Sequence, residues 1–127
     1  MKLQSCGLAV LRIVVGVVFL MHGYQKLFKI GFHGVVGMFG HLGIPLPTVF
    51  AIIVTLAEFI GGILLITGLA TRIPAALNSI DMIVAILLVH LRRGFFNPGG
   101  FEFPLTLLAA TICLVLAGGG SLSLKKF

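Results

Sequence analysis

The stretch PTVFAIIVTLAEFIGGILLITGL, residues 47–69, decides the fold class, because it carries one charged side chain, Glu58, in 23 residues. An α-helix that spans a membrane needs about 20 predominantly apolar residues. The whole chain has the same bias, since it is 59% hydrophobic and only 9% charged. Soluble domains carry about 25% charged residues. We therefore expect an integral membrane protein rather than a soluble domain.

Three further windows of the sequence are long and apolar enough to cross a bilayer. Together they predict an all-α integral membrane four-helix bundle, formed by a single domain over residues 1–127. Proline suits the first turn of a helix, and Pro74 and Pro104 stand there in two of the windows. The glycines at 118–120 are expected to close the last helix. The four expected spans are residues 5–27, 47–69, 73–91 and 102–120.

The segment FKIGFHGVVGMFGHLG, residues 28–43, is too short and too rich in glycine to cross the membrane. Phe32, Val35 and Phe39 recur there at helical spacing, which is typical of an amphipathic helix. We therefore expect a short interfacial or re-entrant segment between the first two spans.

The positive charge of the chain does not indicate nucleic-acid binding. The net charge is +6, but the nine lysines and arginines lie mostly at the ends of apolar runs and form no basic face. Four spans place both termini on one side, here called side A, opposite side B. Side A holds Lys2, Arg72, Lys125 and Lys126, and side B holds Lys26, Lys29, Arg92 and Arg93. Because the two sides carry equal numbers of basic residues, the rule that cytoplasmic loops are basic does not decide the orientation of the chain in the membrane.

Three charged residues lie inside the expected spans, where a charge is costly unless it is paired or hydrated. The helical rise places Arg12 roughly 10 Å, Glu58 roughly 16 Å and Asp81 roughly 12 Å from side A. We expect one buried cluster of these three residues, joined by Asn78 one turn before Asp81. The cluster is either a lock that holds the helices together or a site that handles protons or a ligand. One arginine cannot neutralise two carboxylates, which favours a carboxyl that keeps its proton.

A second polar group is expected near side B. His22 and Lys26 are four residues apart on one helical face. His90 ends the third span at a depth similar to that of His22, roughly 25 Å from side A. Glu102 begins the fourth span, beside the turn sequence GFFNPGGF at 94–101. These four residues predict a head-group pocket with aromatic walls, suited to a quinone or equally to a lipid head group.

The alternative interpretation is that both histidines only make hydrogen bonds at the membrane interface. Two histidines and one glutamate could ligate a metal, but they lack a tight ligand spacing, so we expect no metal site.

Three motifs in the chain resemble those of the DoxX family of small four-span membrane proteins. They are LRIVVGVVFLMHGYQKLF at 11–28, AEFIGGILLITGLATRIPA at 57–75 and VHLRRGFFNPGGFEFPL at 89–105. The resemblance implies a multi-pass protein of the bacterial or archaeal cell (inner) membrane. It also implies a link to quinone-dependent oxidoreductases or to thiol and oxidative stress, because relatives belong to such systems. The chain has no CxxC pair and no cofactor motif, so we expect no intrinsic cofactor, with quinone as the candidate ligand.

Three functions stay open at this point. The first is a membrane subunit of a quinone-linked oxidoreductase or of a thiol and oxidative-stress system, working with a soluble redox subunit. The second is a non-enzymatic membrane scaffold or assembly factor, and the third is a small transporter or lipid-binding protein. The expected partners are membrane lipids and, because four spans make a thin bundle, further copies in a homo-oligomer, but no nucleic acid.

Overall fold

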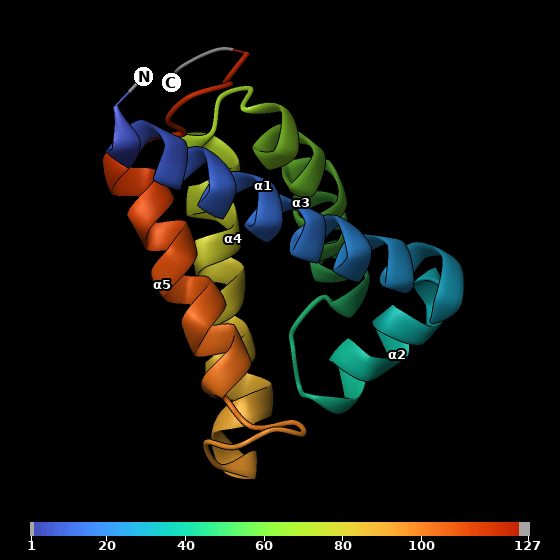
Figure 1. The fold of residues 1–127 in the computed structure, drawn as a ribbon. Coiled ribbons are helices and arrows are strands. Elements are labelled where there is room, and N and C mark those ends of the chain that lie inside the picture. Colours follow the sequence, from blue (N-terminus) through green and yellow to red (C-terminus); the bar gives the residue numbers. More distant parts are fainter. Residues whose placement is uncertain (1, 125–127) are drawn as a thin grey trace.

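The computed structural model describes residues 2–124, which fold into helices joined by short loops (Figure 1). This confirms the predicted all-α class. The helices are α1 (Leu3–Tyr24), α2 (Phe32–His41), α3 (Pro47–Thr67), α4 (Arg72–Ala85) and α5 (Glu102–Ala117). A π-helical turn, Gln25–Lys29, extends α1, and a second one, Ile86–His90, followed by the 3-10 turn Leu91–Arg93, extends α4.

Three of the four expected spans are helices long and apolar enough to cross a membrane. With their extensions they cover Leu3–Lys29, Pro47–Thr67 and Arg72–Arg93. The fourth, α5, is apolar but has 16 residues and ends at Ala117 rather than at residue 120. It ends there because Gly118 adopts a φ of 81°, a conformation that glycine reaches without strain.

The helices α1 and α3 pack backbone to backbone because glycines face each other across the contact. A Cβ atom placed on Gly62 would lie 2.5 Å from the amide nitrogen of Leu20. A Cβ atom on Gly23 would lie 2.6 Å from the Cα atom of Phe59. Small residues allow this close approach of helices in membrane proteins.

We expect Gly62→Ala to lower the free energy of unfolding by roughly 1–3 kcal/mol, because the added methyl group forces α1 away from α3. The matched control is Gly37→Ala on α2, where no heavy atom lies within 4 Å of the added Cβ. Thermal unfolding in one detergent compares the two variants. Equal unfolding temperatures of the Gly62→Ala and Gly37→Ala variants would contradict a close contact between the backbones of α1 and α3.

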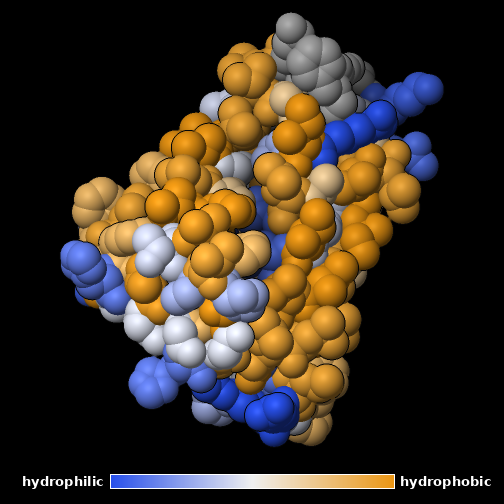
Figure 2. Space-filling model, turned by 180° about the vertical axis from the view of Figure 1, so that it is seen from behind, coloured by the Kyte–Doolittle hydropathy of each residue, from blue (hydrophilic) through white to orange (hydrophobic). Residues whose placement is uncertain are grey.

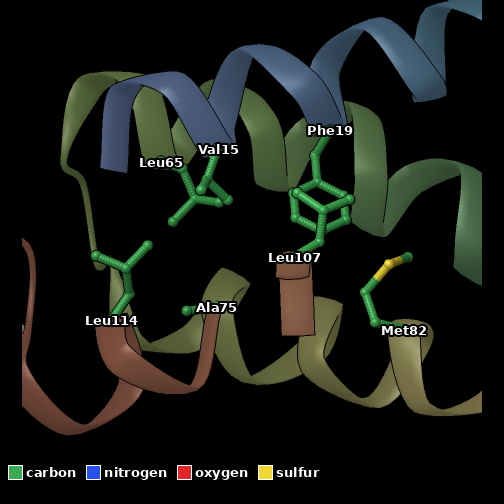
Figure 3. Close-up of a cluster of buried hydrophobic side chains, with 7 residues drawn as sticks. All are labelled: Val15, Phe19, Leu65, Ala75, Met82, Leu107 and Leu114. Carbon is green, nitrogen blue, oxygen red and sulfur yellow. The ribbon is translucent and has the colours of Figure 1, made fainter. Parts of the chain in front are cut away.

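The main core joins four helices around a cluster of buried apolar side chains that point toward one another (Figure 3). Its members are Val15, Phe19, Leu65, Ala75, Met82, Leu107 and Leu114. A smaller cluster of Val35, Phe39 and Ala51 holds α2 against α3. The short helical segment expected between the first two spans is thus α2, and its apolar stripe packs on the bundle.

Large apolar side chains cover much of the outer surface. They are exposed on each of the four long helices, for example at Val10, Ile60, Ile80 and Leu116. Figure 2 shows this apolar surface on one face, with hydrophilic residues at its two ends and smaller groups of them at the left edge and in the middle. A soluble domain buries such side chains, whereas lipid tails solvate them, so the surface is that of a multi-pass membrane protein.

Candidate functional site

A cavity of about 290 Å³ lies between α1, the α4 extension, α5 and the loop at 94–101. Its polar lining residues include His22, Lys26 and His90, three of the four residues predicted for a head-group pocket. Its apolar lining residues are Phe19, Met82, Ala85, Phe103, Pro104 and Leu107, and the loop adds Asn97, Gly99 and Gly100. Residues that are far apart in the sequence, on α1 and on α5, therefore line one cavity.

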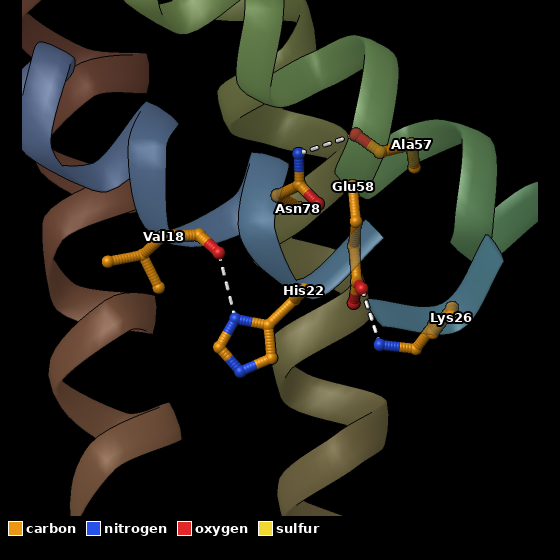
Figure 4. A network of polar contacts seen from close by, with 6 residues as sticks. All are labelled: Val18, His22, Lys26, Ala57, Glu58 and Asn78. Atoms are coloured by element: carbon orange, nitrogen blue, oxygen red, sulfur yellow. Dashed lines mark hydrogen bonds and ion pairs between the residues drawn. The ribbon is translucent and has the colours of Figure 1, made fainter. Parts of the chain in front are cut away.

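The imidazole of His22 is held by its own helix. Its Nδ1 atom lies 2.8 Å from the carbonyl oxygen of Val18, one turn earlier (Figure 4). The ring also stacks near Phe103 of α5, with 6.2 Å between the ring centroids. The two contacts together restrict the orientation of the ring.

The imidazole of His90 ties the α4 extension to the loop. Its Nδ1 atom lies 2.8 Å from the carbonyl oxygen of Gly99. The loop closes on itself through backbone bonds from Phe101 to Gly94 and from Glu102 to Phe95, each 2.9 Å long. His90 thereby holds the loop along the edge of the cavity.

Glu102 lies outside the cavity, which corrects its expected place in the pocket. Its Oε2 atom accepts a hydrogen bond of 2.6 Å from the backbone amide of Asn97. This bond stabilises the turn, so the carboxylate supports the loop rather than the cavity. Asn97 lines the cavity instead. Its position in the Asn-Pro turn was the only sequence signal for it.

Lys26, which lines the cavity, forms an ion pair with Glu58. Their Nζ and Oε1 atoms are 2.5 Å apart, and their side chains are 14% and 4% exposed (Figure 4). The carboxyl of Asp81 lies against that of Glu58. Asn78, fully buried, donates hydrogen bonds to the carbonyl oxygens of Ala57 and Pro74 and so fastens α4 to α3.

Arg12 is not part of this cluster, contrary to the prediction. Its guanidinium donates to the carbonyl oxygens of three residues after α5 and to one hydroxyl group. The acceptors are Gly119 at 2.8 Å, Ser121 at 3.0 Å, Leu122 at 3.1 Å and the Ser123 hydroxyl at 2.5 Å. The polar serines after the last span were the only sequence signal for this contact.

Arg12 lies away from the predicted cluster because α1 is staggered along α3. Gly23 lies against Phe59, although counting from the ends of the expected spans places them roughly 27 Å and 15 Å from side A. The N-terminal end of α1 therefore extends past α3, and Arg12 lies beside Gly68, at the end of α3. Lys26, farther along α1, reaches Glu58 instead.

The cavity brings polar side chains together with aromatic and aliphatic ones, which is typical of ligand pockets. Such pockets measure about 300–1,000 Å³, so at about 290 Å³ this cavity has the size of the smallest of them. Among residues 2–124 there is no group of three or more His, Cys, Asp or Glu side chains placed to hold a metal ion.

The fold and the cavity define a small multi-pass helical membrane protein with a polar site within its bundle. The chain belongs to the DoxX family, whose family model matches residues 7–91. It is 38% identical over 126 residues to the Bacillus subtilis protein named "Putative oxidoreductase CatD", covering 99% of this chain and 90% of that protein.

Two other relatives are named only as membrane proteins. An uncharacterized membrane protein of Mycobacterium tuberculosis is 36% identical over 91% of this chain and 77% of its own length. The inner membrane protein YphA of Escherichia coli is 28% identical over 94% of this chain and 88% of its own length. These relatives agree with a bacterial inner-membrane location. No solved structure matches the chain.

Proposed function

We propose that this protein is a membrane subunit of a quinone-linked oxidoreductase and that it holds a quinone head group in the α1–α4–α5 cavity. The observation that carries the proposal is the convergence of His22, Lys26 and His90 on one cavity that also has aromatic and aliphatic lining residues. The name of the Bacillus subtilis relative, which is that of an oxidoreductase, supports the same class of activity.

In this proposal the chain binds and orients the head group. His22, Lys26 and His90 contact its oxygens, while Phe19 and Phe103 pack against the ring. A bound quinone supplies two-electron, two-proton redox chemistry. The sequence has no cofactor motif of its own, so a soluble subunit with a redox centre completes the system.

The test is the quinone content of the purified protein. We expect His22→Phe and His90→Phe each to lower the bound quinone and quinol, counted together, roughly tenfold, because each removes a polar contact to the ligand. His33→Phe and His41→Phe are the matched controls, since both histidines are exposed on α2. Solvent extraction and chromatography measure quinone per protein in one detergent. Equal quinone in all four variants, or none in the unmodified protein, would refute the proposal.

A second candidate is a non-enzymatic scaffold that assembles other membrane proteins. It is favoured by the way Arg12 and Glu58 bond to atoms of the chain itself, as expected of residues that fasten helices. Under this proposal the purified protein carries no quinone but is isolated with a stoichiometric membrane partner, and His90→Phe leaves that association unchanged.

A further inference from the structure

Both histidines of the cavity use the same ring nitrogen to bind the backbone. Nδ1 of His22 contacts the Val18 carbonyl oxygen, and Nδ1 of His90 contacts the Gly99 carbonyl oxygen, each at 2.8 Å. A carbonyl oxygen can only accept a hydrogen bond, so each Nδ1 must carry the hydrogen. In a neutral imidazole the second nitrogen, Nε2, then has a lone pair and no hydrogen.

Both histidines line the cavity, and their Nε2 atoms are free to accept a hydrogen bond from a ligand. Within residues 2–124, the hydrogen bonds of His22 and His90 all involve Nδ1. Lys26 adds a donor, because its ammonium has three hydrogens and Glu58 accepts one of them. Beside the amide of Asn97, which can both donate and accept, the lining therefore offers two acceptors from the histidines and one donating ammonium.

We infer that the cavity selects the reduced form of its ligand, a quinol, over the oxidised quinone; this inference rests on the proposed function. A quinol has two hydroxyl groups that donate to the two Nε2 atoms, and a hydroxyl oxygen also accepts from Lys26. A quinone has carbonyl oxygens only, which place lone pairs against the lone pairs of both histidines. The oxidised ligand thus displaces water from two acceptors without giving them a donor, which is costly.

The experiment measures the affinity of the full chain in nanodiscs for a short-chain quinone and for its quinol, kept reduced under nitrogen. We expect the quinol to bind at least tenfold more tightly, the effect of about two net hydrogen bonds. The readout is calorimetric binding, which needs no soluble partner and no turnover.

The decisive variant is the double substitution His22→Asn and His90→Asn. An asparagine amide can still donate to the Val18 and Gly99 carbonyl oxygens, but it lacks the atom that corresponds to Nε2. We expect the preference for the quinol to fall to about twofold, with little change in the unfolding temperature. The single variant His90→Phe also loses the backbone bond and should loosen the loop.

The possible outcomes separate the inference from the proposed function. Tighter or equal binding of the quinone overturns the inference and leaves the quinone site in place. A quinol preference that survives the double asparagine variant also overturns it, because the preference then has another source. Binding of neither form overturns both the inference and the proposed function.

Discussion

Replacing Arg12 by leucine is expected to lower the free energy of unfolding by roughly 3 kcal/mol or more, and to release the segment after α5. Arg12 has no exposed surface, and its guanidinium holds three backbone carbonyls and the hydroxyl of Ser123. Leucine leaves these part-buried acceptors without their donor, and each orphaned group that water does not reach costs about 1–3 kcal/mol.

Two further variants make the Arg12 prediction specific. Arg12→Lys keeps the charge but replaces the planar guanidinium with a single ammonium, so it should fall between the wild type and Arg12→Leu. Arg92→Leu is the control, since Arg92 is exposed near the opposite end of the bundle. Thermal unfolding in detergent measures the loss of stability. Protease cleavage after residue 117 measures the release of the segment that follows α5. Equal behaviour of Arg12→Leu and Arg92→Leu would contradict the described contact.

Removal of Lys26 is the change with the second-largest expected effect. Lys26→Ala leaves Glu58 and Asp81 side by side without their cation. Breaking a buried ion pair by removing one partner costs about 3–5 kcal/mol, because the remaining charge is uncompensated. We therefore expect low accumulation in the membrane and a lower unfolding temperature. Lys29→Ala is the matched control, because Lys29 is exposed on the same π-helical turn.

The double variant Lys26→Met with Glu58→Gln tests whether the loss comes from the uncompensated charge. Replacing both members of a buried pair by neutral groups is often close to neutral, so much of the stability should return. The single variants Lys26→Met and Glu58→Gln complete the comparison. If the double variant loses as much free energy of unfolding as these two single variants together, the two side chains act independently.

The sequence by itself determined the class and the helices. Apolar length and the positions of proline and glycine are local properties, so they predict where a span begins and ends without knowledge of its neighbours. The same holds for α2, whose spacing of Phe32, Val35 and Phe39 already indicates an apolar stripe. His22 and Lys26 share a face for the same local reason, and both line the cavity.

Only the tertiary structure decided which charges meet. Counting residues along a helix measures length along its axis, but the pairing of Glu58 depends on how far α1 slides past α3. That stagger is set by the contact of Gly23 with Phe59 and of Gly62 with Leu20, which is a property of two surfaces together. It brings Lys26 to Glu58, and it leaves Arg12 beside the polar segment that follows α5.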